Sequence, residues 1–236
     1  MFSNECILRP VKTYAQRLRD TLSPAERRVF AKLSTPKKIQ DFLDTLPVNF
    51  EGGEKILSPR RVLRTGKAHC IEGALLAAAA LAYHGASPLL LDFQTIPADE
   101  DHVIAVFKQN GLWGAISKTN HSVIRWRDPV YRSTRELAMS YFHEYLMWNG
   151  KKSLRAFSTK PFDLSRYKPE RWVTTDKDLG WLAGDLDWAP HSPAVPKKSL
   201  AHLRKASSIE LSAMKLTEWK KSKKKKIASM FSVLKN

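Results

Sequence analysis

The chain has 236 residues, 43% of them apolar and 10% aromatic, and it carries a formal net charge of +17. This apolar content excludes a wholly disordered chain, and the length is enough for one substantial core with appendages. The two cysteines in the sequence exclude a disulfide framework and a metal site built from clustered cysteines.

The sequence predicts a cytoplasmic protein without a cofactor. The first residues, Met1 to Glu5, lack the charged and apolar pattern of a signal peptide. The most apolar run, from Ala74 to Ala82, is shorter than the roughly 18–20 residues that cross a bilayer, so no transmembrane segment is expected. We therefore expect a reducing compartment, in which Cys6 and Cys70 remain thiols.

The positive charge is unevenly distributed along the chain. From Leu211 to Asn236, eight lysines and one glutamate give a charge of +7, and the preceding 210 residues carry the remaining +10. The run from Lys220 to Lys226 predicts a solvated tail, or else a docking segment for an anionic partner such as a phosphate, an anionic lipid or an acidic surface. Binding of nucleic acid or of a membrane surface is an alternative function, although the sequence has no basic helix with base-reading spacing.

Residues 1–55 predict a helical N-terminal segment. Ser23-Pro24-Ala25-Glu26 combines an N-cap serine, a proline in the first turn and a glutamate at the third helical position, which is a capping box. A second helix is expected from Thr35-Pro36 until Pro47 stops it. Ser58-Pro59 then predicts a short helical turn ahead of a polar loop.

The next helix is expected from Cys70 to about His84, where Gly85 supplies a left-handed stop. Its surface from Ala74 to Tyr83 is nearly all apolar. A helix that is apolar on every side is buried, so the pattern predicts the central helix of the fold.

Four strands are predicted after this helix, over residues 88–94, 102–107, 112–118 and 122–126. The second and third are joined by Asn110-Gly111, a strong hairpin signal. A two-residue turn there pairs Gln109 with Leu112. His102, Ser117 and Thr119 then share one face of the sheet, and Asn120 points to the other.

A further capping box at Ser133-Thr134-Arg135-Glu136 predicts a helix that runs to Asn149-Gly150, and residues 153–158 predict an edge strand. Beyond Pro161 the chain is rich in proline, tryptophan and charge, which predicts an irregular flank. The expected fold class is α+β, with a cysteine-bearing helix packed on an antiparallel sheet. The expected divisions are a core over 56–160, a C-terminal extension packed on it over 161–210 and a basic tail over 211–236.

Cys70 is the candidate nucleophile. A thiol at a helix N-terminus feels the positive end of the helix dipole, and the nearby Arg64, Lys67 and His69 favour the thiolate in the same way. His102 follows 32 residues later at the head of a predicted strand. The structural alternatives are a Cys70 that fills the core and a His102 that belongs to an ordinary polar loop edge.

These residues together resemble the transglutaminase-like cysteine enzymes, which have a papain-like core. The match consists of Gly66-x-x-x-Cys70-x-Glu72-x-Ala74, the apolar helix that follows, His102-Val103 and then Trp113 on the next strand, and it covers about residues 56–130. The family usually has its loop glycine two residues before the cysteine, and the gap here is wider. Its third catalytic residue, usually aspartate, lies four residues after the tryptophan, and this sequence has Ser117 there.

The resemblance implies a peptidase, amidase or acyltransferase that acts on a peptide or protein substrate. Cys70 would attack an amide or ester carbonyl, His102 would hold and return the proton, and Ser117 would orient the imidazole. A bulge near Lys118 would give the orienting role to Asn120. A hydroxyl carries no charge, so the alternative is a catalytically lapsed fold that binds peptide or protein in the old cleft.

Overall fold

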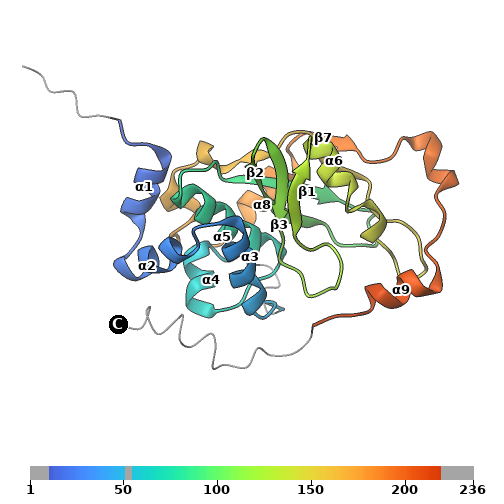
Figure 1. Ribbon diagram of the computed structural model, residues 1–236, viewed down its shortest axis with the longest axis horizontal. Coiled ribbons are helices and arrows are strands. Elements are labelled where there is room, and N and C mark those ends of the chain that lie inside the picture. Colours follow the sequence, from blue (N-terminus) through green and yellow to red (C-terminus); the bar gives the residue numbers. More distant parts are fainter. Residues whose placement is uncertain (1–10, 51–54, 219–236) are drawn as a thin grey trace, which may run out of the picture.

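The computed structural model describes residues 11–50 and 55–218, and it is α+β, as predicted (Figure 1). The α-helices are α1 (Tyr14–Thr21), α2 (Pro24–Lys32), α3 (Pro36–Thr45), α4 (Pro59–Thr65), α5 (Cys70–Tyr83), α6 (Thr134–Met139), α7 (Pro169–Trp172), α8 (Gly180–Asp187) and α9 (Ser208–Met214). The 3-10 helices are η1 (Phe142–Glu144), η2 (Leu164–Arg166) and η3 (Lys197–His202). The strands are β1 (Leu89–Gln94), β2 (His102–Gln109), β3 (Leu112–Ile116), β4 (Arg127–Tyr131), β5 (Ala156–Ser158), β6 (Phe162–Asp163) and β7 (His191–Pro193).

The strands form one antiparallel sheet in the order β4-β3-β2-β1-β5-β7, and β6 also pairs with β1. The hairpin register is confirmed, because Gln109 pairs with Leu112 and Ala105 pairs with Ile116. Asn110 and Gly111 have φ angles of 51° and 80°, as a tight hairpin turn requires. The turn therefore sets the register that places the first residue of β2 beside the end of β3.

The helices at the N-terminal end of the fold begin with side-chain caps. Ser23, Thr35 and Ser58 each accept a hydrogen bond from the backbone three residues later, as their sequences predict. α1 is an unpredicted helix, and Thr13 and Gln16 form a capping box at its start. Leu18 of α1 is fully buried, so this helix belongs to the core.

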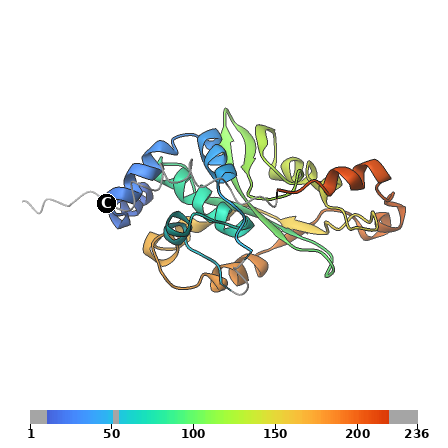
Figure 2. The same cartoon turned by 90° about the horizontal axis from the view of Figure 1, so that it is seen from below.

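The sheet separates two apolar cores, since side chains alternate along each strand. Leu90 and Val103 point into the core that contains α5 and the first four helices. Phe93 and Ile104 point into a second core that α6 closes. Figures 1 and 2 show α1 to α5 gathered at one end of the molecule, with the sheet beyond them. Residues Ala74 to Ala82 of α5 are buried, which confirms it as the central helix.

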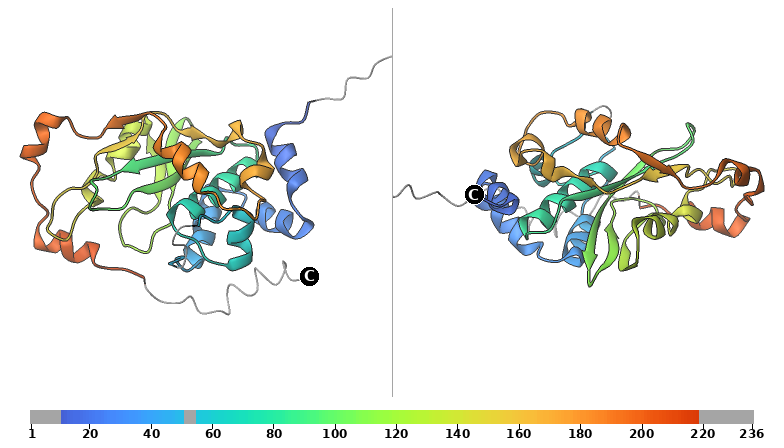
Figure 3. Two further views of the ribbon diagram at one scale, coloured as in Figure 1. Left: turned by 180° about the vertical axis from the view of Figure 1, so that it is seen from behind. Right: turned by 90° about the horizontal axis from the view of Figure 1, so that it is seen from above.

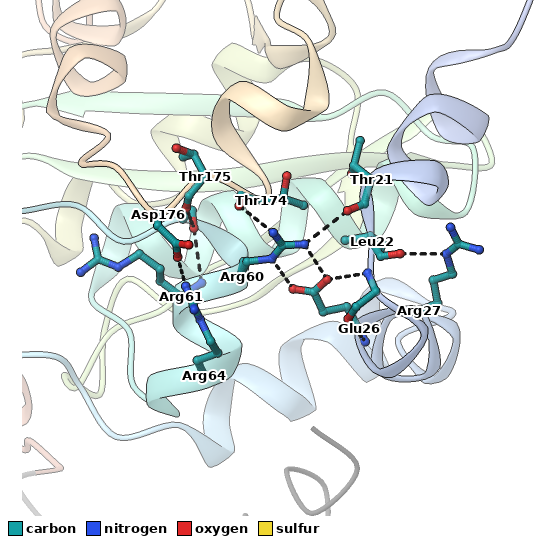
Figure 4. A network of polar contacts seen from close by, with 12 residues as sticks. Thr21, Leu22, Glu26, Arg27, Arg60, Arg61, Arg64, Thr174, Thr175 and Asp176 are labelled. Carbon is teal, nitrogen blue, oxygen red and sulfur yellow. Dashed lines mark hydrogen bonds and ion pairs between the residues drawn. The ribbon is translucent and has the colours of Figure 1, made fainter. Parts of the chain in front are cut away.

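An ion-pair network joins the N-terminal helices to the chain beyond α7 (Figure 4). Arg60 of α4 forms two hydrogen bonds with Glu26 of α2, at 2.6 and 2.9 Å, and donates to the carbonyl of Thr174. Arg64 pairs with Asp176. Because bidentate arginine–carboxylate pairs have a fixed geometry, this network holds α2 and α4 in place against the C-terminal part of the chain.

Two predicted elements differ from the structure. Residues 122–126 are irregular, because Ile124 has a φ of +57° that interrupts an extended strand, and β4 begins only at Arg127. The helix expected to reach Asn149 ends at Met139. The chain continues into η1, and Tyr141 and Tyr145 on either side of η1 are both buried in the second core.

The C-terminal flank is more regular than predicted. It supplies β7 and pairs it with β5, so β5 lies inside the sheet rather than at its edge. Trp172 is fully buried, whereas Trp188 is 90% exposed.

The segment with α9 passes around the far end of the sheet from α1 (Figure 3). It then returns to the body of the molecule, because Ser122 donates to the carbonyl of Leu216 and Glu218 donates to that of Asn120. Residues 211–218 of the expected tail are thus folded, and the lysine run and Cys6 lie outside the described residues. Among the helices that the structure describes, none is long and apolar enough to cross a membrane.

Candidate functional site

Cys70 lies at the first position of α5, half-buried, with its sulfur turned toward backbone amides. Both the amide of Ile71, in the same helical turn, and the amide of Val103, on β2, donate to the sulfur. Val103 directly follows His102, so the fold brings the N-terminus of α5 to the start of β2. The two residues that the sequence singled out therefore lie at one place.

Glu72 holds the loop that precedes Cys70. Its side chain is completely buried and accepts hydrogen bonds from the backbone amides of Leu57 and His69, each at 2.9 Å. The side-chain amide of Asn49 contacts both carboxylate oxygens, at 3.2 and 3.1 Å. A carboxylate in the first turn also complements the helix dipole, as the sequence indicated. Glu72 thus fixes where α5 begins, and with it the position of the thiol.

His102 is hydrogen-bonded to Ser117, with its Nε2 2.9 Å from the Ser117 Oγ. Both side chains are buried, at 9% and 2% exposure. The confirmed hairpin register places the two residues diagonally on one face of neighbouring strands, a separation that an extended imidazole can span. The backbone carbonyl of Asn120 instead binds the C-terminal segment through Glu218.

The hydrogen-bond network assigns the tautomer of His102. The Ser117 Oγ lies 2.6 Å from the carbonyl oxygen of Ile124. A carbonyl only accepts, so the Ser117 hydroxyl proton is directed to Ile124, and the Ser117 oxygen accepts the proton on His102 Nε2. In the neutral ring, Nδ1 is then unprotonated and free to accept a proton.

Two contacts from α3 and α5 hold the end of β3 in place. The side-chain amide of Gln40 bonds both backbone groups of Ser117, donating to its carbonyl at 2.9 Å and accepting from its N–H at 3.0 Å. Lys118 lies against Gly73 of α5 and donates to the carbonyl of Leu46 at 2.5 Å. Gln40 was not predicted, because nothing local in the sequence relates it to a residue 77 positions away.

Burial sets the protonation state of both groups. It raises the pKa of the Cys70 thiol, and the charges of Glu100 and Asp92 raise it further, while the Val103 and Ile71 amides lower it. It also lowers the pKa of His102 to about 4, with the charge of His121 acting in the same direction. At neutral pH, Cys70 is therefore a thiol and His102 a neutral imidazole.

The expectation of a low thiol pKa is thus contradicted, because desolvation outweighs the helix dipole. Arg64, one of the cations expected to stabilise the thiolate, is instead paired with Asp176. The basic loop therefore contributes less positive charge at the sulfur than its sequence indicates.

Tyr145 is a further polar group of the site, although the sequence pattern predicts only that it lies on a helix. Its hydroxyl is buried and has no hydrogen-bond partner within the part of the chain that the structure describes. Its ring packs on Phe93, with centroids 5.8 Å apart, and Phe93 pairs with His102 across the sheet. Burial raises the pKa of Tyr145, and among the charges that raise it further Cys70 is the strongest. Tyr145 thus has a buried donor hydroxyl within electrostatic range of the thiol.

A second titratable pair lies on the neighbouring strand. Asp92 of β1 pairs with Val103 in the sheet and contacts His191 Nε2 of β7 at 3.0 Å. Burial raises the pKa of Asp92 to about 6, although the charge of His191 lowers it. The two residues are 99 positions apart, so sequence reasoning had no signal for this pair.

Within residues 11–50 and 55–218, no three His, Cys, Asp or Glu side chains converge in a way that would hold a metal ion. The chain matches no protein-family model, and no curated protein matches it. Its function is therefore inferred from the geometry of Cys70, His102 and Ser117.

Proposed function

We propose that this protein is a cysteine-dependent enzyme that transfers or hydrolyses acyl groups of amide or peptide substrates. The observation that supports this most strongly is the hydrogen bond from His102 Nε2 to Ser117, in a strand whose next amide donates to the Cys70 sulfur. A nucleophile, a base and a group that orients the base are the parts that such catalysis needs. The transglutaminase-like resemblance stays part of this proposal.

The reaction starts from a neutral pair in this proposal. As the Cys70 sulfur attacks the carbonyl carbon, a C–S bond forms, the thiol proton moves to His102 Nδ1 and the carbonyl π electrons move to oxygen. When the tetrahedral intermediate collapses, the bond to the leaving amine breaks and His102 returns its proton to that amine. Water or a second amine then attacks the thioester carbon and gives a proton to His102, and as the C–S bond breaks His102 returns a proton to the Cys70 sulfur.

The Tyr145 hydroxyl is the donor that we assign to the developing oxyanion. A preorganised donor that has no partner in the resting protein costs nothing to release when charge develops on the substrate oxygen. Burial raises the pKa of Tyr145 and the charge of Cys70 raises it further, which indicates that the hydroxyl lies within electrostatic range of the thiol. A backbone amide at the start of α5 would be the second donor.

An acyl probe tests the proposal directly. Incubation with p-nitrophenyl acetate should transfer an acetyl group to Cys70, detected by mass spectrometry, faster than to free cysteine. His102→Ala should slow this by about 100-fold, the usual contribution of a general base. Ser117→Ala should slow it far more than the matched variant Asn120→Ala, since Ser117 is the residue that contacts the imidazole.

A second candidate function is supported by the raised thiol pKa and by a hydroxyl at the place of the family's aspartate. In that case the fold binds peptide or protein without catalysis. If Cys70 is acetylated no faster than free cysteine, and His102→Ala changes nothing, the enzyme proposal is wrong and the binding function is favoured.

A further inference from the structure

Ile124 has a backbone conformation that its side chain disfavours. Its φ of +57° lies in the left-handed region, where a β-branched residue is a genuine outlier. Asn110, the other described non-glycine residue with positive φ, lies in the hairpin turn that needs this conformation. No hairpin turn accounts for Ile124, so other contacts must hold it. Such strain persists where surrounding contacts impose it, and it is concentrated at functional sites.

Two hydrogen bonds hold Ile124 in this conformation. Its N–H donates to Glu144 Oε2 at 2.6 Å, and its carbonyl accepts the Ser117 hydroxyl at 2.6 Å. The bond to Glu144 has a carboxylate as its acceptor, and such hydrogen bonds are stronger than those between neutral groups. Its side chain packs on the second core, so the residue is held from three directions.

Glu144 is itself held firmly. Arg127 Nη2 donates to Glu144 Oε1 at 2.5 Å, so one carboxylate oxygen binds the arginine and the other binds Ile124. The Arg127 guanidinium is fixed by the Ser140 hydroxyl at 3.0 Å and lies 4.0 Å from the centroid of the Tyr141 ring. The position of the carboxylate is therefore set by Arg127 of β4, which Ser140 and Tyr141 at the end of α6 hold in place.

We propose that Glu144 is a positioning residue that selects the tautomer of His102. By holding Ile124 in the left-handed region it keeps the Ile124 carbonyl directed at Ser117. The Ser117 hydroxyl then donates to that carbonyl and accepts from His102 Nε2, which leaves Nδ1 unprotonated. The catalytic value of this tautomer rests on the proposed function, whereas the tautomer itself is measurable without any substrate.

Loss of the Glu144 contact reverses the direction of the hydrogen bond between His102 and Ser117. Ile124 relaxes to negative φ, and its carbonyl leaves the Ser117 hydroxyl. That hydroxyl then donates to His102 Nε2, and the ring proton moves to Nδ1. When Nδ1 carries the ring proton, it cannot accept the proton of the Cys70 thiol, and Nε2 is occupied by Ser117.

The test is the ¹⁵N NMR spectrum of histidine-labelled full-length protein at pH 7, with the His102 signals assigned from their absence in His102→Gln. The wild type should show a protonated Nε2 and an unprotonated Nδ1. Glu144→Gln keeps an acceptor for the Ile124 amide and should give the same spectrum. Glu144→Ala should shift the ring toward Nδ1 protonation and slow acetylation of Cys70 at least tenfold. Adding Ile124→Gly to Glu144→Ala should restore the wild-type tautomer, because glycine adopts the left-handed region without strain.

An unchanged Nε2-protonated ring in Glu144→Ala would overturn the proposal, as would a double variant that fails to restore it. If Glu144→Ala does not fold, Glu144→Asp is used, which keeps the charge but withdraws the carboxylate by one methylene, and the same shift is expected. If the tautomer changes as expected while even the wild type is never acetylated, the positioning role stands and the proposed enzyme function fails.

Discussion

At the scale of single residues, the site consists of buried polar groups. Burial disfavours their charged forms and makes a missing hydrogen bond costly in free energy. Cys70 and His102 are both held neutral by desolvation, and the buried hydroxyl of Tyr145 has no partner among the described residues. An unsatisfied buried hydroxyl lowers the free energy of unfolding, so a protein that keeps one sacrifices stability there. Functional sites often lower the free energy of unfolding, because activity requires groups that a stable core would exclude.

Tyr145→Phe should separate stability from activity. Removing the unpartnered hydroxyl should raise the free energy of unfolding by about 1 kcal/mol, measured by urea denaturation. The same change should slow acetylation of Cys70 by about tenfold or more, because an oxyanion donor is lost. Alkylation by iodoacetamide forms no oxyanion, so its rate should stay the same.

The matched control is Tyr141→Phe, since the Tyr141 hydroxyl donates to the Arg125 carbonyl at 2.9 Å. Its loss should instead destabilise the protein by about 1 kcal/mol. If Tyr145→Phe destabilises the protein as Tyr141→Phe does, the Tyr145 hydroxyl has a structural partner, and the donor role is wrong.

At the scale of elements, the site depends on how closely α5 approaches the end of β3. A Cβ added to Gly73 would lie 2.4 Å from the Cβ of Lys118, at the stiff base of that side chain. Lys118 follows Ser117 directly, so any displacement there moves the residue that binds His102. The glycine in the first turns of α5 is therefore a packing requirement of the site.

Gly73→Ala should destabilise the protein by about 1–3 kcal/mol, the usual cost of overpacking, although alanine is the better helix former. Gly184→Ala in α8 is the control, because a Cβ there meets no atom within 4 Å. It should stabilise the protein by up to about 1 kcal/mol. Thermal unfolding of both variants measures these changes in stability. Equal changes in melting temperature for the two variants would show that α5 has room for a Cβ at Gly73.

At the scale of the whole molecule, segments far apart in sequence meet at the sheet. Asp92 of β1 and His191 of β7 come together because β5 places the C-terminal flank next to the central strands. Asp101 and Asp187 add negative charge around the same carboxyl and raise its pKa. The pair therefore makes the stability of the fold depend on pH.

Asp92→Asn should remove this pH dependence. The folded-state pKa of Asp92, about 6 against an ordinary 3.8, means that the folded protein binds this proton more tightly than the unfolded chain. Its contribution to stability is therefore present below pH 4 and is lost as the pH rises through 6. Relative to Asp92→Asn, the wild type should lose about 2 kcal/mol of unfolding free energy between pH 4 and pH 7. Urea denaturation at several pH values measures this. A difference in unfolding free energy between the two proteins that stays constant from pH 4 to pH 7 would refute the raised pKa of Asp92.

The sequence alone determined the features that depend on neighbours within a few residues. The caps at Ser23, Thr35 and Ser58, the Asn110-Gly111 turn and the buried helix from Cys70 all follow from contacts between residues close in the chain. The hairpin register is also determined locally, because a two-residue turn allows only one pairing of the two strands. It was enough to bring Ser117 to His102 on one face of the sheet.

Tertiary structure alone decided the properties that depend on distant residues. The thiol pKa rises because desolvation comes from the whole fold, which no local pattern of charges reveals. Gln40, Glu144 and Tyr145 reach the site from other elements, and Ile124 is strained because Glu144 and Ser117 hold both of its backbone groups. Local propensity would have left Ile124 in a strand, and the combined strength of these long-range contacts overrides it.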